Sequence, residues 1–141
     1  MARFVTQVPL RWTDQDSYRH VNHARAVTLL EEARIDLFFD AAADGGVNGF
    51  SGGLLVAALN VAYRRQIAYR SEPLRVAMWV DQVRAASFRI SYALHDGPGE
   101  NDPVAIEATT AMALYDLHAQ RPRRLSSEER AFLASWADVP S

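Results

Sequence analysis

A polar segment, Trp12–His23, holds several side chains that are able to do chemistry within twelve residues. Its carboxylates, imidazoles, amide, phenol and hydroxyl are supplied by these residues: Thr13, Asp14, Asp16, Tyr18, His20, Asn22 and His23. The segment lies between an alternating apolar run and a long stretch without Gly or Pro. A polar cluster between a predicted strand and a predicted buried helix indicates a functional site.

Three interpretations of this segment are open. Short carboxylates such as Asp14 and Asp16 commonly cap turns and helices. A metal site is a second interpretation, with His20 and His23 as further ligands, but the segment lacks the glycine and closing glutamate of a calcium loop. It also lacks a His-x-x-x-His pair, so we expect no metal. The third interpretation is catalysis by one carboxylate.

The catalytic interpretation depends on the helix predicted to follow. The first N–H groups of a helix are unpaired and carry partial positive charge. They stabilise the oxyanion that develops on a thioester or ester carbonyl. Asp16, just before this helix, is then placed to attack the carbonyl or to activate a water molecule. Such a site requires no serine, cysteine or metal.

The first half of the chain predicts one strand and one long helix. Residues 4–12 alternate with period two, and Pro9 places the strand at an edge or a bulge. After a loop over 13–22, a helix is expected from His23 to about Asp40, with Asn22 as its N-cap. Because apolar residues cover most of its circumference, we expect this helix to be buried.

The second half predicts four consecutive strands and a short helix. The strands are expected at 54–65, 74–83, 87–95 and 104–116, and the continuous apolar run of 54–65 predicts a central strand. A short amphipathic helix follows, from a capping residue at Ser126 to near Ala137. The predicted fold class is α+β: a single domain, residues 1–141, with a five-stranded antiparallel sheet around one long helix.

Composition excludes several classes of protein. The 141 residues are 49% hydrophobic, the formal charge is −2, and there is no cysteine. We therefore expect no disulfide or zinc-thiolate site, and neither nucleic acid nor a membrane as partner. The first residues lack the apolar core of a signal peptide, so the sequence predicts a cytoplasmic protein.

Three segments together resemble a family signature. Arg11–Asp16, His20–His23 and the helical Glu31-Glu32-Ala33-Arg34 are similar to the motif of hotdog-fold acyl-CoA thioesterases, of the 4-hydroxybenzoyl-CoA thioesterase type. Tyr63-Arg64-Arg65 resembles the strand end of that family. The resemblance covers nearly the whole chain and implies hydrolysis of an acyl-CoA thioester, with coenzyme A entering only as part of the substrate.

The resemblance also implies roles for particular residues. Asp16 matches the catalytic carboxylate, the His23 backbone N–H matches the donor that polarises the carbonyl, and Asn22 supports them. The substrate-binding residues implied are Tyr18, His20, Arg64 and Arg65. For the two arginines, contact with coenzyme A phosphates and a solvated strand end both stay open. A homodimer or homotetramer with sites between subunits is expected.

The sequence departs from the family pattern at several positions. Arg19 replaces a glycine, while His23, Ala26 and Gln66 replace an asparagine, an aromatic residue and a proline. Arg19 motivates an alternative: a non-catalytic protein that binds acyl-CoA or another apolar ligand. A thioesterase for acyl carrier protein is a second alternative, with a docking patch at this cluster: Arg121, Arg123 and Arg124. Residues expected at the acyl pocket, or else in the core, are Ala24, Ala26, Phe50, Leu54 and Leu55.

Overall fold

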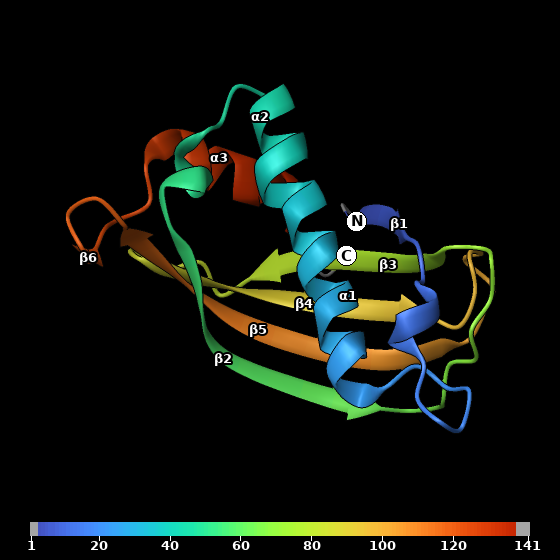
Figure 1. The fold of residues 1–141 in the computed structure, drawn as a ribbon. Helices are drawn as coiled ribbons and strands as arrows, with labels where there is room; N and C mark the ends of the chain where they lie inside the picture. Colours follow the sequence, from blue (N-terminus) through green and yellow to red (C-terminus); the bar gives the residue numbers. More distant parts are fainter. Residues whose placement is uncertain (1–2, 138–141) are drawn as a thin grey trace.

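A long helical segment crosses a single antiparallel sheet in the computed structural model, which describes residues 3–137 (Figure 1). The segment consists of α1 (His23–Ile35), a π-helical stretch η2 (Asp36–Ala41) and α2 (Ala42–Asp44). The strands are β1 (Phe4–Val8), β2 (Leu54–Tyr63), β3 (Leu74–Asp81), β4 (Ser87–His95), β5 (Val104–Asp116) and β6 (Arg121–Pro122). The short 3₁₀ turns are η1 (Trp12–Asp14) and η3 (Gly49–Gly52), and the last helix is α3 (Ser127–Ser135).

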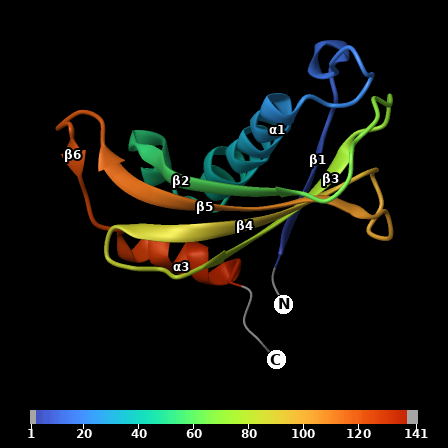
Figure 2. The same cartoon turned by 90° about the horizontal axis from the view of Figure 1, so that it is seen from below.

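The sheet has the order β1-β3-β4-β5-β2, with the two-residue β6 paired to β5. Seen after a 90° turn, the sheet curls around one side of the helix (Figure 2). This confirms the predicted α+β architecture of a curled antiparallel sheet around one long helix. No helix within residues 3–137 is long and apolar enough to cross a membrane.

The start of α1 follows the sequence prediction. Its first residue is His23, and the Asn22 side chain accepts a hydrogen bond from the Ala24 N–H at 2.9 Å, as an N-cap does. Strand β1 is shorter than predicted, because it ends before Pro9, which has no N–H to donate. The predicted edge position of β1 is confirmed.

The prediction that residues 54–65 form a central strand is wrong. Strand β2 is at the edge of the sheet and pairs only with β5, so its other side has no strand partner among the described residues. The central helix is likewise not buried all round, since Ile35 and Phe39 are 41% and 45% exposed. Most residues of β2 are exposed, although the apolar run predicted a strand with neighbours on both sides. The small strand β6 was not predicted.

Aromatic rings pack the core between the helix and the sheet. The Phe38 ring of η2 lies 5.1 Å from that of Phe50 and 5.5 Å from that of Phe88 on β4, measured between centroids. Phe132 of α3 packs against the same group at 6.4 Å from Phe38. These contacts hold the C-terminal part of the central helix against the sheet, whereas its N-terminus lies next to the polar loop.

A buried ion pair fastens α3 to the rest of the fold. The Glu129 side chain is 1% exposed and accepts two hydrogen bonds of 2.7 Å from the Arg123 guanidinium. It also accepts the Ser126 N–H, so the predicted capping residue Ser126 is part of a capping box at the start of α3. Burial raises the pKa of Glu129, but the hydrogen bonds from Arg123 and Ser126 and the charge of Arg123 outweigh it, so the pKa lies below its usual value.

Candidate active site

The loop that contains Asp16 is folded back on itself by hydrogen bonds. The Asp16 N–H donates to the His20 carbonyl at 2.8 Å, and the Arg19 N–H donates to the Asp16 carbonyl at 3.0 Å. The carboxylate oxygen Oδ1 accepts the Tyr18 N–H at 2.8 Å and the His20 N–H at 3.4 Å. Within residues 3–137, the second oxygen of Asp16 has no hydrogen-bond partner and remains available to a ligand.

Arg19 has the backbone conformation that a glycine would favour. Its φ is +63°, in the left-handed region. A side chain there brings Cβ close to the following carbonyl oxygen, at a cost of about 1–2 kcal/mol. The loop therefore keeps a turn with positive φ although the glycine of the family motif is absent. The replacement of that glycine by Arg19 changes the side chain but not the turn.

Asp14 has a structural part. It is fully buried, and its carboxylate accepts the Arg11 backbone N–H at 2.8 Å and pairs with the Arg11 guanidinium at 3.1 Å. Its carbonyl oxygen accepts the Asn22 N–H at 2.9 Å, so the turn is tied to the start of α1. Both acidic residues thus cap backbone N–H groups, but Asp14 uses both carboxylate oxygens on Arg11, whereas Asp16 uses only Oδ1 within residues 3–137. No group of three or more potential metal ligands lies together in the described part of the chain.

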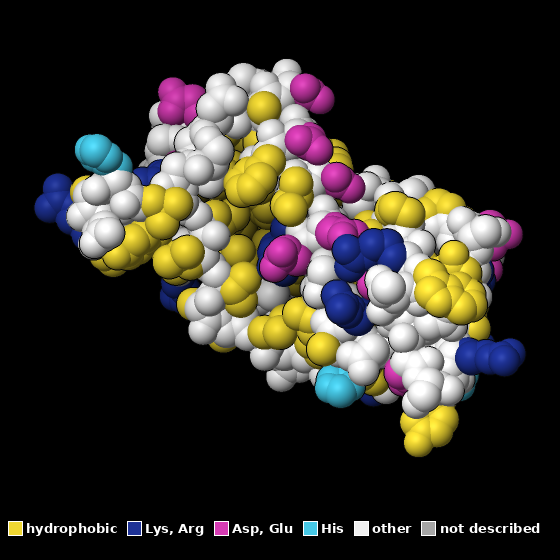
Figure 3. All heavy atoms as spheres, viewed as in Figure 1, with side chains coloured by type: hydrophobic (Ala, Val, Ile, Leu, Met, Phe, Trp, Pro, Cys, Tyr) yellow, Lys and Arg dark blue, Asp and Glu magenta, His cyan; other side chains and the backbone are white. Residues whose placement is uncertain are grey.

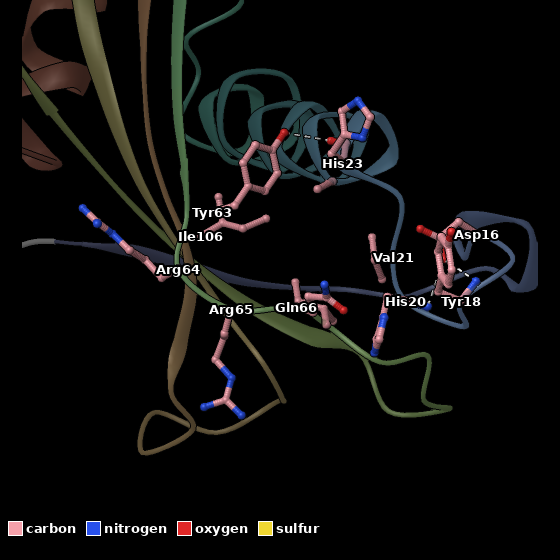
Figure 4. A pocket seen from close by; sticks show the side chains of 12 residues that line it. Asp16, Tyr18, His20, Val21, His23, Tyr63, Arg64, Arg65, Gln66 and Ile106 are labelled. Atoms are coloured by element: carbon pink, nitrogen blue, oxygen red, sulfur yellow. Dashed lines mark hydrogen bonds between the residues drawn. The ribbon is translucent and has the colours of Figure 1, made fainter.

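The N-terminus of α1 faces the same region as Asp16. Among the hydrogen bonds of residues 3–137, none uses the His23 N–H, so this donor is unpaired at the positive end of the helix. The His23 carbonyl oxygen accepts the Tyr63 hydroxyl at 3.0 Å, which joins the end of β2 to the start of α1 (Figure 4). Asn22 caps the helix and does not line the cavity described next.

A cavity of about 790 Å³ brings most of the predicted site residues together (Figure 4). Its lining includes Asp16, Tyr18, His20, His23, Arg64 and Arg65. The remaining lining residues are Val21, Ala26, Tyr63, Gln66, Ile67 and Ile106. Of these, Ile106 carries no signal in the sequence, because its place depends on its pairing with Tyr63 across β2 and β5. Tyr63 belongs to the strand end Tyr63-Arg64-Arg65 that resembles the family, but the resemblance implied no role for it in the site.

The two arginines of the cavity are already paired with carboxylates. Arg64 lies 3.3 Å from Glu107, and Arg65 lies 3.3 Å from Asp96, which also pairs with Arg70. Both arginine side chains lie across the cavity from Asp16 and extend away from it (Figure 4). Their charge is therefore partly balanced before any ligand arrives.

The residues expected at the acyl pocket are distributed over four places. Ala26 lines the cavity, whereas Ala24 is exposed and outside its lining. Phe50 was expected at the acyl pocket or else in the core, and its ring is fully buried in the core. Leu54 and Leu55 line a separate groove of about 290 Å³ between the helix and β2. Hydrophobic side chains gather around this hollow beside the helix (Figure 3).

Two comparisons with known proteins find similarity over most of this chain. A family model described as the thioesterase-like superfamily matches residues 10–136. The long-chain acyl-CoA thioesterase FadM of Escherichia coli K12 is 29% identical over 125 residues, covering 89% of this chain and 92% of its own.

Two solved structures have a similar fold. A predicted thioesterase from Bacillus stearothermophilus superposes with a TM-score of 0.82 at 19% identity, over 99% of this chain and 100% of its own. A thioesterase from Thermus thermophilus, solved with coenzyme A and Zn, gives a TM-score of 0.74 at 22% identity, over 96% of this chain and 95% of its own.

Proposed function

This chain belongs to the thioesterase-like superfamily, and from that membership we propose that it hydrolyses acyl-CoA thioesters to a free acid and coenzyme A. One observation carries the proposal. The Asp16 carboxylate, with one oxygen unpaired within residues 3–137, and His23, the first residue of α1, line a single cavity. The relative named a long-chain acyl-CoA thioesterase and the fold of the structure that holds coenzyme A support the same substrate class.

In the proposed reaction, the His23 N–H polarises the thioester carbonyl and stabilises its oxyanion. Two routes are open to Asp16. As a nucleophile, its carboxylate bonds to the carbonyl carbon, the C–S bond breaks, and water then cleaves the resulting anhydride to restore Asp16. As a general base, Asp16 takes a proton from water while the water oxygen bonds to the carbonyl carbon. In both routes coenzyme A leaves as a thiolate and is protonated.

The other residues of the cavity have supporting parts in this proposal. Asn22 holds the first turn of α1, and so the His23 N–H, in place. Tyr18 and His20 form the wall next to Asp16 and contact the substrate. Because Arg64 and Arg65 are already paired, we assign them the attraction of a polyanionic substrate to the mouth of the cavity.

The decisive experiment is hydrolysis of a panel of acyl-CoA thioesters by wild type and Asp16→Asn, followed by thiol release. The amide keeps an oxygen that accepts the Tyr18 and His20 N–H groups but removes the charge, so we expect kcat to fall by about 10²–10⁴ with the fold intact. Asp44→Asn, an exposed carboxylate at the other end of the central helix, is the control. Equal rates for Asp16→Asn and wild type would refute the assignment.

Two further measurements separate the alternatives. A single turnover in heavy-oxygen water labels Asp16 only if the carboxylate is the nucleophile. Tight binding of acyl-CoA without thiol release across the panel would instead support the non-catalytic ligand-binding alternative. The carrier-protein alternative is weakened as a docking patch, since Arg123 is occupied by Glu129 and leaves only Arg121 and Arg124 exposed.

We further propose that the functional form is a dimer, or a pair of dimers, in which the open edges of β2 meet. This edge is ten residues long and carries Leu55, Val56 and Leu59, each more than two-fifths exposed. Open apolar edges of this kind pair with another strand, and two copies do so antiparallel about a twofold axis. The arrangement places the partner next to Tyr63 and the cavity.

Leu59→Arg tests the dimer. We expect light scattering to show the 15.7 kDa monomer and activity to fall, while Val83→Arg, an exposed apolar site away from β2, leaves the larger mass unchanged. A wild-type monomer that is fully active would contradict a site completed by a partner.

A further inference from the structure

A second cavity, of about 830 Å³, adjoins the candidate active site on the other face of the Asp16 loop. Its lining is Trp12, Thr13, Gln15, Asp16, Arg19, Ala68 and Tyr69. Residues of the loop alternate between the two cavities, with Tyr18 and His20 on the first and Gln15 and Arg19 on the second. Asp16 lines both, so the two cavities meet at this residue. Its volume is typical of small-molecule sites.

The second cavity presents an exposed aromatic face on a fixed support. Trp12 is 72% exposed, unusual for the largest apolar side chain, and its ring meets that of Tyr69 edge to face at 5.5 Å. The η1 turn that carries Trp12 is held by the buried Asp14 and its bonds to Arg11. A held aromatic face in contact with water is a stacking surface for a planar ring, and nucleobases stack on such surfaces regardless of sequence.

The same cavity also offers a cationic side chain. Arg19 forms no ion pair within residues 3–137, unlike Arg64 and Arg65 on the other side of the loop. Gln15 also lines the cavity, but its side-chain nitrogen is buried and is therefore not open to a ligand there. An aromatic face and a guanidinium that forms no ion pair among the described residues together match a planar heterocycle that carries phosphate.

We propose that this second cavity binds the phosphorylated nucleoside end of the coenzyme A thioester, with the base stacked on Trp12 and a phosphate held by Arg19. The inference rests on the proposed function, because it extends the same substrate from Asp16 into the neighbouring cavity. The proposed site also explains why an arginine occupies a left-handed position that favours glycine, because the arginine supplies the cation that binds phosphate. It also selects coenzyme A over a carrier protein as the acyl donor, since the phosphopantetheine arm of a carrier lacks the base.

The test is direct binding of adenosine 3′,5′-bisphosphate, measured by calorimetry, which needs no turnover. We expect the wild type to bind, Trp12→Leu to weaken binding by about 5-fold or more through loss of stacking, and Arg19→Ala to weaken it by about 3- to 10-fold. Trp12→Phe, which keeps an aromatic face, and Arg19→Lys, which keeps the charge, retain most of the affinity. Arg84→Ala removes an exposed arginine elsewhere and serves as the control.

Kinetics provide the second arm. Trp12→Leu and Arg19→Ala should raise the KM for an acyl-CoA more than that for the matching acyl-pantetheine, which has no nucleotide. Absence of bisphosphate binding in the wild type, equal binding in all variants, or loss in Arg65→Ala instead would overturn the proposal. So would a change in mass by light scattering for Trp12→Leu, which would make Trp12 an interface residue. Acyl-CoA hydrolysis without bisphosphate binding would refute this inference but not the proposed function. Bisphosphate binding without acyl-CoA hydrolysis would refute the proposed function but not the nucleotide site.

Discussion

Replacement of Arg19 by glycine should make the protein more stable. The φ of +63° costs an arginine about 1–2 kcal/mol that glycine does not pay. Glycine loses more backbone freedom on folding, which offsets about 0.5–1 kcal/mol of this gain. No ion pair within residues 3–137 is lost with the side chain. The net expectation is a rise of about 0.5–1 kcal/mol in the free energy of unfolding, or about 2–3 °C in Tm for a domain of this size.

Urea and thermal titrations of four proteins measure this effect: wild type, Arg19→Gly, Arg19→Ala and Ser17→Gly. Alanine removes the charge but keeps Cβ, so Arg19→Ala should gain nothing from relief of backbone strain. Ser17 lies in the same loop without positive φ, and glycine there should lower stability. If Arg19→Gly is no more stable than Arg19→Ala, the left-handed conformation is wrong, and with it the account of how the loop tolerates arginine.

Two further predictions concern stability. Glu129→Gln should lower the free energy of unfolding by about 3 kcal/mol because it leaves Arg123 without its buried carboxylate. Because the folded-state pKa of Glu129 is lowered, its contribution is present above the unfolded pKa of about 4.3 and is lost as pH falls through the folded value. Urea titrations from neutral to acidic pH should therefore show the wild-type advantage shrinking below about pH 4, and a constant difference would contradict it. Gly53→Ala should lower the free energy of unfolding by about 2 kcal/mol or more, since φ is +148° and the new Cβ would lie 2.1 Å from a backbone oxygen. The control is Gly52→Ala, whose new Cβ meets nothing within 4 Å. In the same titration it should change the free energy of unfolding by no more than about 0.5 kcal/mol.

Local signals predicted the parts of the fold that local interactions control. The start of α1 follows from Asn22, whose side chain reaches an N–H two residues ahead, and the capping box of α3 follows from Ser126 and Glu129. The end of β1 was not predicted, because the alternating pattern extended the strand to Trp12 and Pro9 indicated only an edge or a bulge, whereas β1 ends at Val8. At both helix caps the determining atoms lie within a few residues of one another, so their spacing along the chain is enough to identify them.

The candidate site was predictable for the same reason, but only in part. Most of its polar members come from one loop and the adjacent helix start, and Asp16, Tyr18, His20 and His23 line one cavity. Ile106 joins them through strand pairing, which depends on a register that the pattern of one strand does not specify.

Short-range signals in the chain thus establish where the helix begins, which carboxylate stands before it and that the fold is an antiparallel sheet around a long helix. Capping and hydrophobic period are properties of neighbouring residues. Three features emerge only on folding: β2 is an open edge, Arg19 is left-handed, and the Asp16 loop separates two cavities. Edge position and the facing of side chains depend on contacts between segments distant in the chain, whereas the left-handed turn at Arg19 is closed by hydrogen bonds of Asp16 with Arg19 and His20. The residues of the candidate site are therefore close together in the sequence, whereas the two cavities that border the Asp16 loop form only in the folded protein.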